Sequence, residues 1–275
     1  TGNITDTVAL TVSGTTTLTT SANNATIALN NTSNAFTGAL TITTNDDSGT
    51  DADVTIDGGT TALNIGASTI DGDLTVTSGA SVTGIMDSDT VTVGGNLVAT
   101  IDANNGGIDL GTISVTGTDA LSTNNAVTID NGSLNLDLVT SNVGGNLTLT
   151  SGASAGITDS GTVTVGGNLV ATTDANNGVI NMGTMAVDGT FALTTNGTGD
   201  ATIVNDLDLQ LIESTIGGDF SATATTGRIY NTGTIVVNGA TTMVVSSLIT
   251  NTAINIGIAS GDDPNSFKGA MTFTT

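Results

Sequence analysis

Short runs of alternating apolar and polar residues, separated by corners rich in Gly, Asn and Asp, recur along the chain. Residues 162–183 show the pattern as TVTV, a Gly-Gly corner, NLVAT, a DANNG corner and VINMG. Apolar residues two positions apart lie on one face of a strand. In this stretch they are Val163, Val165, Leu169, Ala171, Ile180 and Met182. The alternation predicts three short β-strands, each with one buried face, joined by three corners in about 22 residues.

The sequence repeats itself with a long period of 72 to 73 residues. The stretch TVTVGGNLVATIDANNG at 90–106 returns as TVTVGGNLVATTDANNG at 162–178. A second set of related stretches begins at Leu63, Leu136 and Leu209, with a spacing of 73 residues. A fixed period of this kind is typical of an architecture built by stacking one structural unit.

A shorter period lies inside the long one and is marked by a glycine just before each NLVAT-like run. Successive marker glycines are 21 to 23 residues apart, except for two gaps of 28 and 29. They are Gly72, Gly95, Gly117, Gly145, Gly167, Gly189, Gly218 and Gly239. We therefore interpret each long repeat as three rungs, one of which carries six or seven additional residues. These residues lie near 131–139 and 205–212, and we interpret them as loop insertions.

A rung of this length cannot bury its own apolar residues, so successive rungs must stack into parallel sheets around a continuous core. The expected fold class is all-β: a right-handed parallel β-helix (β-solenoid) with three short strands per rung and roughly twelve rungs. At about 4.8 Å per rung, residues 1–275 would form a single elongated domain. Pro264 stands among Asp and Asn residues, in a corner where no ladder hydrogen bond is lost.

The end of the chain resembles its beginning. NAFTGALTIT at 34–43 corresponds to NSFKGAMTFT at 265–274, an offset of 231 residues. We infer a tandem array in which the 275 residues cover slightly more than one large unit and form a fragment of a longer chain.

Composition and charge exclude several classes of function. The 25 acidic residues stand against two basic ones, Arg228 and Lys268, and the formal net charge of −23 would repel a phosphate backbone. The sequence has no His and no Cys, so it lacks the commonest zinc, iron and copper ligands and the usual nucleophile and base pairs. No apolar run reaches the length of a membrane span. We therefore expect no nucleic-acid partner and no membrane insertion, and any chemistry must use carboxylates.

Two short motifs carry a resemblance to a known family. The motif N-x-F-x-G-A occurs at 34–39 and 265–270, and Gly-Gly-Asn-Leu corners occur at 94–97, 144–147 and 166–169. With these motifs and its repeats, nearly the whole chain resembles the filamentous-haemagglutinin-like bacterial surface proteins. The resemblance implies a very long, secreted right-handed β-helix that serves as an adhesin or a surface fibre, and therefore an extracellular, cell-surface location.

The densest acidic stretch, NDDSGTDADVTIDGG, is the candidate metal site. Its carboxylates could supply several oxygen ligands to Ca²⁺, the one cofactor that we consider; they belong to Asp46, Asp47, Asp51, Asp53 and Asp57. The spacing does not fit an EF-hand, because no Glu stands at the twelfth position, and it lacks the nonapeptide repeat of calcium-binding β-rolls. A solvated acidic loop is the alternative interpretation. The same two interpretations apply to three other acidic corners: Asp71 with Asp73, Asp87 with Asp89, and Asp262 with Asp263.

An enzymatic role has little support in the sequence. Some β-helices cleave acidic polysaccharides with paired carboxylates, but such a pair should occupy one unique groove. Asp102 and Asp174 instead recur at equivalent positions and are typical turn formers. Tyr230 beside Arg228 is the one local hint of a binding pocket. We predict no catalytic residues and a protein that is not an enzyme.

A column of threonines raises the hypothesis of ice binding. It comprises Thr90, Thr112, Thr162, Thr184 and Thr234. The next outward position varies between Thr, Ser, Ala and Val, so the column does not extend into a flat threonine plane. Ordinary cross-strand pairing on an exposed β surface is the simpler interpretation.

Two functions from different classes remain. The first is a structural segment of a secreted cell-surface filament, fibre or sheath, which extends as a rigid rod or associates with itself end to end or laterally. The second is an adhesin module that binds a surface glycan or receptor through the insertions near 131–139 and 205–212. Loop substitutions that abolish attachment but leave filament assembly intact would favour the adhesin.

Overall fold

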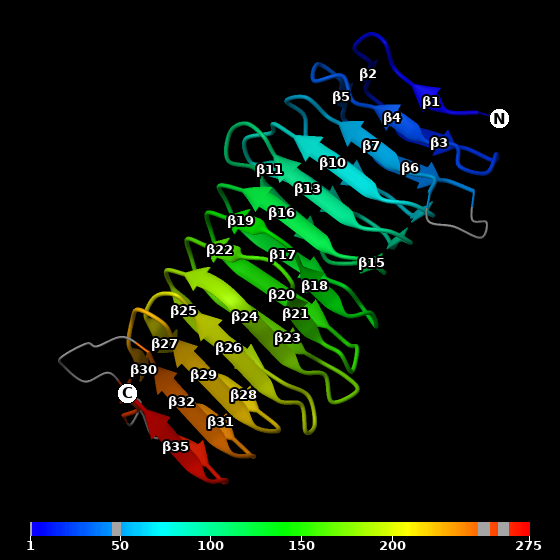
Figure 1. The fold of residues 1–275 in the computed structure, drawn as a ribbon. Coiled ribbons are helices and arrows are strands. Elements are labelled where there is room, and N and C mark those ends of the chain that lie inside the picture. Colours follow the sequence, from blue (N-terminus) through cyan, green and yellow to red (C-terminus); the bar gives the residue numbers. More distant parts are fainter. Residues whose placement is uncertain (1, 46–50, 247–253, 258–263) are drawn as a thin grey trace. The chain divides into compact units, whose positions relative to one another are not determined.

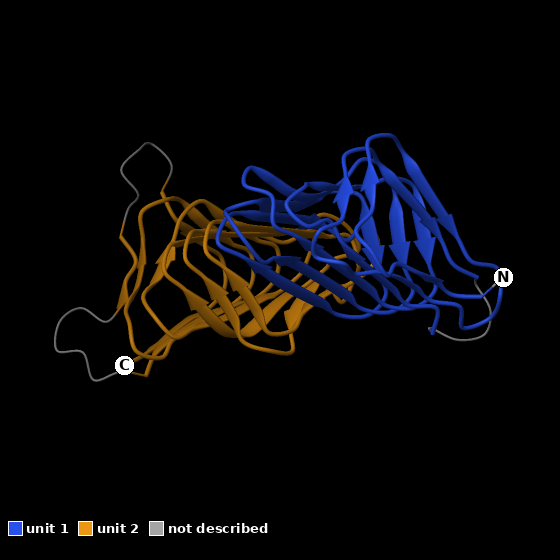
Figure 2. Ribbon diagram, turned by 90° about the horizontal axis from the view of Figure 1, so that it is seen from above, with its two compact units in different colours: residues 1–132 blue, residues 133–275 orange. Residues whose placement is uncertain are grey.

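The fold is all-β: a parallel β-solenoid with about 22 residues per rung and about 11 rungs, close to the roughly twelve expected from the sequence. The computed structural model describes residues 2–45, 51–246, 254–257 and 264–275. These residues contain no helix, and therefore none long and apolar enough to cross a membrane. The chain divides into two compact units, residues 1–132 and 133–275 (Figure 2). The expectation of a single elongated domain stays a prediction.

Unit 1 contains strands β1 to β17, most of which are labelled in Figure 1. Their bounds are β1 Ile4–Thr5, β2 Thr11–Val12, β3 Thr16–Thr19, β4 Ile27–Leu29, β5 Ala35–Phe36, β6 Leu40–Thr43, β7 Val54–Asp57, β8 Leu63–Ile65, β9 Ser68–Ile70, β10 Leu74–Ser78, β11 Thr83–Asp87, β12 Val91–Val93, β13 Leu97–Ile101, β14 Gly107–Leu110, β15 Ile113–Val115, β16 Asp119–Thr123 and β17 Val127–Asp130.

Unit 2 contains strands β18 to β35. Their bounds are β18 Leu136–Leu138, β19 Ser141–Val143, β20 Leu147–Ser151, β21 Ile157–Asp159, β22 Val163–Val165, β23 Leu169–Thr173, β24 Ile180–Val187, β25 Thr190–Thr194, β26 Ala201–Asn205, β27 Leu209–Leu211, β28 Ser214–Ile216, β29 Phe220–Ala224, β30 Ile229–Asn231, β31 Ile235–Val237, β32 Thr241–Val245, β33 Ile254–Asn255, β34 Ser266–Phe267 and β35 Met271–Thr274.

A regular rung consists of one straight long strand and one kinked pair of short strands, which confirms the expected three strands per rung. In unit 1, β10 is a long strand, and β11 and β12 form the kinked pair that follows it. Long strand stacks on long strand in parallel register, as β10 on β13, and kinked pair stacks on kinked pair, as β11 and β12 on β14 and β15. The rung is thus flattened, with two opposed sheets enclosing the core.

The core of each unit is a set of stacked aliphatic columns. Leu74 lies in register with Leu97, and Ile85 with Ile108, and all four side chains are buried. Burying one such side chain contributes about 1.5–3 kcal/mol, and every rung adds several. Because each inward position is filled from the rungs before and after it, small Val, Ile, Leu and Ala residues fill the narrow space without many aromatic rings. The alternation in the sequence therefore specified the buried faces correctly.

The segments interpreted as loop insertions are short turns, at 131–135 and 206–208, that lead directly into strands β18 and β27, and the additional length of each long repeat is a strand that precedes the turn. Each long repeat contains one extra straight strand, which we call the switch strand: β7, β17 and β26. In unit 2, switch strand β26 stacks on the kinked strand β24 of the preceding rung and is followed in the same sheet by long strand β29. On the opposite side, long strand β25 is followed by the kinked pair β27 and β28. The extra residues thus build half a rung and move the long strands to the opposite sheet.

The same exchange occurs in unit 1. Switch strand β7 lies between β4 and long strand β10, while long strand β6 contacts β8 and β9. From the start of β7 to the start of β17, unit 1 contains seven half-rungs. The long repeat therefore holds three and a half rungs, not the three with a loop insertion expected from the sequence.

A buried asparagine side chain completes the hydrogen bonding at two of the switch strands. In unit 2, the Asn205 amide accepts from the Val187 N–H at 2.9 Å and donates to the Val187 carbonyl at 3.2 Å. In unit 1, Asn131 forms the same pair of bonds with Val115, at 2.6 and 3.0 Å. All four residues are fully buried. The side-chain amide replaces the peptide group that a stacked kinked pair would have supplied.

Candidate functional site

The acidic and amide side chains at the Gly-Gly corners form hydrogen-bond ladders along each unit. In unit 1, Asp53 Oδ1 accepts from the backbone N–H of Asp73 at 2.9 Å, and Asp73 Oδ1 accepts from the N–H of Asn96 at 2.7 Å. In unit 2, Asn146 Oδ1 accepts from the N–H of Asn168 at 2.9 Å. Each corner side chain thus bonds the corner of the next rung and fixes the rung spacing.

The glycine before each corner side chain is required by this close approach. A Cβ at Gly95 would lie 2.2 Å from Asp73 Oδ1 and 2.8 Å from the carbonyl carbon of Gly72. A Cβ at Gly167 would lie 2.5 Å from Asn146 Oδ1. The motif Gly-Gly-Asn-Leu, which carried the family resemblance, is therefore a packing motif: glycine leaves space for the side-chain oxygen of the rung before.

A second set of corner contacts lies inside one kinked pair of each unit. Asp159 Oδ1 accepts from the Gly183 N–H at 2.6 Å, and Asp159 Oδ2 accepts from the N–H and the hydroxyl of Thr184, both at 2.7 Å. Asp87 makes the same three contacts with the Gly-Thr corner of its next rung. Two members of the threonine column thus act as hydroxyl donors to a corner carboxylate.

The candidate calcium residues are only partly within the described structure. Asp46 and Asp47 lie outside the described residues. Of the others, Asp53 belongs to the corner ladder, and Asp57 Oδ1 accepts from the Gly59 N–H at 2.7 Å. Within the described ranges, no three acidic side chains gather in a way that could hold a metal ion. Calcium binding by this stretch stays a prediction.

Burial raises the pKa of the Asp57 carboxyl, and the negative charges of Asp102 and Asp6 add to this effect, while the bond from Gly59 opposes it. Asp57 is only 8% exposed. A carboxylate that is held away from water and near like charges is destabilised in its ionised form. The folded chain is therefore less stable when Asp57 is ionised than when it is protonated.

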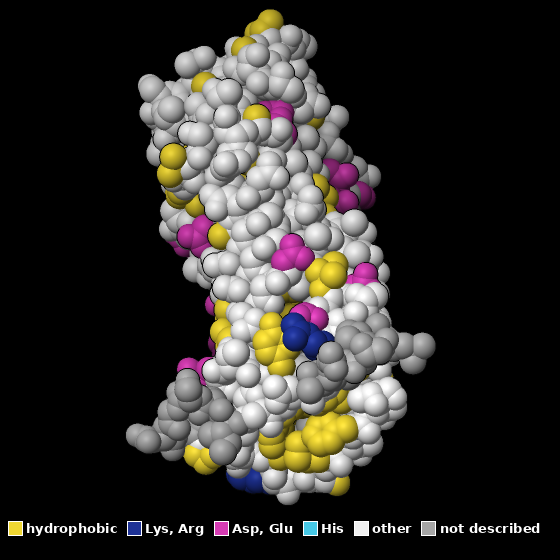
Figure 3. Space-filling view, turned by 90° about the vertical axis from the view of Figure 1, so that its left-hand side faces the viewer, with side chains coloured by type: hydrophobic (Ala, Val, Ile, Leu, Met, Phe, Trp, Pro, Cys, Tyr) yellow, Lys and Arg dark blue, Asp and Glu magenta, His cyan; other side chains and the backbone are white. Residues whose placement is uncertain are grey.

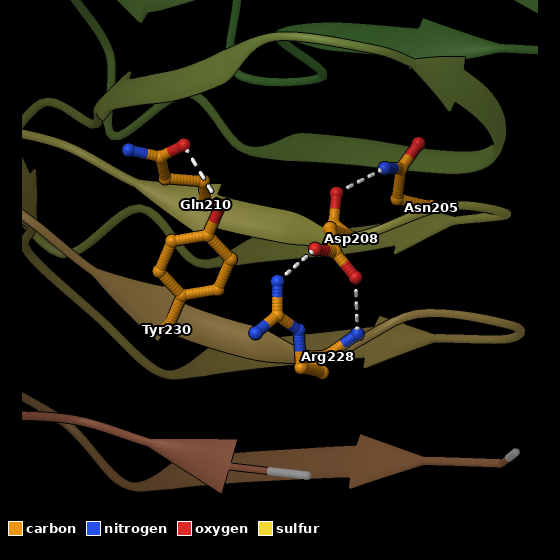
Figure 4. Close-up of polar contacts among 5 residues, drawn as sticks. All are labelled: Asn205, Asp208, Gln210, Arg228 and Tyr230. Carbon is orange, nitrogen blue, oxygen red and sulfur yellow. Dashed lines mark hydrogen bonds and ion pairs between the residues drawn. The ribbon is translucent and has the colours of Figure 1, made fainter. Parts of the chain in front are cut away.

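The local pair singled out in the sequence, Arg228 and Tyr230, belongs to a cluster on the surface of unit 2 (Figure 4). The Arg228 guanidinium donates to Asp208 Oδ2 at 2.7 Å and lies 5.1 Å from the centre of the Tyr230 ring. The Tyr230 hydroxyl donates to Gln210 Oε1 at 2.9 Å. The hydrogen bond from Arg228 lowers the pKa of Asp208, and the same bond raises the pKa of Arg228.

This cluster joins neighbouring rungs, because Gln210 and Tyr230 are register partners on β27 and β30. In Figure 3 a basic group lies against an acidic one, on a face that carries scattered acidic and hydrophobic side chains and a second basic group at its lower end. The positive charge of Arg228 is already paired, so the cluster fits cross-strand stabilisation better than recognition of an anionic ligand.

Two open grooves recur at equivalent positions of the long repeat, one in each unit. The groove in unit 2 has a volume of about 260 Å³ and is lined by Thr162, Gly183, Thr184, Met185, Ala186, Val204, Asp206 and Thr225. The groove in unit 1 has a volume of about 240 Å³ and is lined by Thr90, Gly111, Thr112, Ile113, Ser114, Asp130 and Gly132. We call these the switch grooves, because each lies where a switch strand stacks on a kinked pair.

Sequence reasoning placed function near the insertions but missed the grooves and the buried Asn131 and Asn205. The available signal was the stretch ATIVN at 201–205, which has the alternation of a long strand and not the composition of a loop. The stretch VTIDN at 127–131 has the same pattern. Their strand-like pattern, and not the length of the gap, was the evidence for an added half-rung.

Parallel ladders, stacked aliphatic columns and corner ladders together define the protein as a repetitive parallel β-solenoid. A family model described as Repeats of unknown function (DUF5649) matches residues 1–43, 51–112, 124–180 and 198–274. These stretches make up most of the chain, so the chain belongs to this family. Comparison with curated proteins and with solved structures gave no match. Identity as a filamentous-haemagglutinin-like protein stays a prediction.

The limits of the family matches agree with the structural repeat. The last three matched stretches begin at residues 51, 124 and 198, each three residues before a switch strand. The family repeat therefore begins with the half-rung that moves the long strands to the opposite sheet.

Proposed function

We propose that the chain is a structural segment of a secreted bacterial cell-surface fibre, filament or sheath, and that it acts as a stiff spacer without enzymatic activity. The observation that carries the proposal is the double support between successive rungs along each run of Asx corners. Backbone ladders join the strands, and Asx side chains join the corners between them. Carboxylates that in an enzyme would act on a substrate serve here as acceptors for the next rung.

A force along the solenoid axis must break the hydrogen bonds of a rung together, because the strands of both sheets and the corners lie across that axis. The aliphatic columns add cohesion that does not depend on bond direction. The net charge of −23 gives neighbouring fibres a mutual repulsion that opposes nonspecific clumping. Extension by further rungs of the same kind, or end-to-end association with another copy, would lengthen such a fibre.

Electron microscopy of the purified chain, together with X-ray diffraction from aligned samples, tests this proposal. We expect filaments with a meridional reflection at about 4.8 Å, the spacing of stacked parallel strands. Filaments that persist in a calcium chelator would support a self-sufficient structural role, and filaments that dissolve would identify Ca²⁺ as part of the assembly. Compact particles that cleave a polysaccharide would contradict the proposal.

An adhesin module is the second candidate function, and the switch grooves favour it. Both grooves are open to solvent, recur once per long repeat and lie at the segments where sequence reasoning placed recognition. Recognition by a surface groove differs from the loop-based recognition expected from the sequence. The two functions are compatible, since a fibre can carry binding sites along its length.

A further inference from the structure

The switch grooves arise from a mismatch in strand shape. In unit 2, the kinked strand β24 contains one residue more than β26 between the register pairs Met182 with Ile203 and Met185 with Asn205. The corner Gly183–Thr184 therefore bulges outward, and the straight switch strand passes without covering it. In a regular rung another kinked corner would cover this position. The groove is thus a direct consequence of the added half-rung.

The walls of the groove in unit 2 offer mainly hydrogen-bond acceptors. The single proton of the Thr184 hydroxyl is shared between two acceptors, Asp159 Oδ2 and the Gly161 carbonyl, each 2.7 Å away, so towards the groove its oxygen can only accept. The Thr225 hydroxyl donates to Asp206 Oδ1 at 2.5 Å. The Asp206 carboxylate can accept further bonds, since its two oxygens carry about four acceptor positions.

The floor of the groove is apolar. It is formed by buried Met185 and by half-buried Ala186 and Val204. The groove in unit 1 has Ile113 at the position of Met185 and Ser114 at the position of Ala186. Its carboxylate, Asp130, stands at the position of Val204, two residues before that of Asp206, so both grooves hold a carboxylate but at different positions. A ligand for both grooves must therefore donate several hydrogen bonds at its edge and present a C–H face below.

From these features we infer that each switch groove binds one saccharide ring that is uncharged or carries an amine, as part of a longer glycan. Hydroxyl groups donate to the acceptor-rich walls, and the C–H face of the ring lies on the apolar floor. The groove carboxylate and the net charge of −23 exclude anionic sugars such as uronates. This inference rests on the adhesin candidate and names its ligand class and its site.

The size of the grooves limits the affinity of each site. A volume of about 240 to 260 Å³ lies below the range of about 300–1,000 Å³ that holds drug-sized ligands. A single ring in a shallow groove is expected to bind weakly, roughly in the millimolar range. A repeating glycan that engages both described grooves would gain affinity by multivalency.

Saturation-transfer difference NMR on the 275-residue chain tests the inference, with methyl β-glucopyranoside, glucosamine and glucuronate as probes. We expect transfer to the ring C–H protons of the first two sugars and about fivefold less, or none, to glucuronate, because the groove carboxylate repels it. Absence of transfer to both the neutral and the amino sugar at millimolar concentration overturns the inference, as does equal transfer to all three.

Matched leucine variants locate the site. Ser114→Leu with Ala186→Leu fills both grooves, and Thr92→Leu with Thr164→Leu places the same side chains at the register partners one rung earlier, outside the grooves. We expect the first pair to reduce transfer about fivefold or more, since leucine occupies the volume of the ring. The second pair should leave it unchanged. Equal loss in both pairs overturns the assignment.

A charge variant keeps the test valid if the leucine variants fold poorly. Asp130→Asn with Asp206→Asn preserves the shape of both grooves and should lower glucosamine transfer by about threefold, with little change for the methyl glucoside. No change for either sugar contradicts the role of the carboxylates.

The two proposals can fail separately. Fibres without saccharide transfer would contradict this inference alone, whereas saccharide transfer without fibres would contradict the structural proposal alone.

Discussion

Replacement of Asn205 by alanine removes the side chain that completes switch strand β26. In the folded chain, the Asn205 amide makes three hydrogen bonds, two with the backbone of Val187 and one to the Asp208 carbonyl at 2.8 Å. Asn205 and Val187 are both fully buried. Alanine leaves the N–H and the carbonyl of Val187 without partners in a site that water reaches poorly.

The expected loss in the free energy of unfolding follows from the two backbone groups of Val187 that lose their partners. Each buried backbone group that loses its partner costs about 1–3 kcal/mol. Two such groups give an expected loss of about 3–4 kcal/mol in the free energy of unfolding, once partial relaxation around the smaller side chain is allowed for. The matched control is Asn181→Ala, at an exposed position of the adjacent strand β24, which should change stability by about 0.5 kcal/mol or less.

Urea unfolding followed by circular dichroism measures this difference, and an unchanged slope would show that the unfolding transition is comparable. Hydrogen exchange of the Val187 amide gives a local measurement, and we expect much faster exchange in the Asn205 variant than in the control. Equal midpoints and equal exchange for the two variants would refute the account of the switch strand.

The substitution Asn205→Asp separates the two roles of the Asn205 side chain, which accepts one hydrogen bond and donates two. The carboxylate keeps an acceptor for the Val187 N–H but places negative oxygen against the carbonyls of Val187 and Asp208. Its pKa is therefore raised in the folded state, so stability is highest at low pH, where the protonated group can donate, and is lost as the pH rises through that pKa. A variant with the same stability at all pH values would contradict the donor role of the amide.

Three further predictions concern the corners. Gly95→Ala should destabilise by about 1–3 kcal/mol through overpacking, whereas Gly111→Ala, where a Cβ meets nothing within 4 Å, should be close to neutral in thermal unfolding. Asp57→Asn should stabilise the chain near neutral pH, because the raised pKa of Asp57 means that stability is lost as the pH rises through that value; a smaller gain at lower pH in urea titrations checks the sign. Asp159→Ala, which removes the acceptor of three bonds from Gly183 and Thr184, should cost about 2 kcal/mol and speed amide exchange at Thr184.

The buried faces could be predicted from the sequence because alternation is a local property. In a parallel strand such as β23, inward Leu169 and Ala171 can be identified from their spacing alone. Which sheet the strand joins is not a local property. The switch strand β26 has the same alternation as a long strand, and only its stacking on β24 shows that it completes half a rung.

The candidate site was harder to predict for a related reason. The sequence offered Asp53 as a calcium ligand or as part of a solvated loop, but in the structure its carboxylate accepts from the N–H of Asp73, 20 residues further along the chain. This pairing depends on the rung register, which sequence spacing gave only to within a residue or two. The grooves depend on a mismatch between two stacked strands of different length, and no single segment carries that information.

An odd number of half-rungs has a consequence for the two sheets. The seven half-rungs from β7 to β17 move the long strands to the opposite sheet at each switch, as unit 2 shows again with β20, β23 and β25 in one sheet and β29, β32 and β35 in the other. Each sheet therefore holds long strands in one long repeat and kinked pairs in the next, as β25 is followed by β27 and β28 in its own sheet. The half-rung that opens the switch grooves is thus also the feature that exchanges the roles of the two sheets.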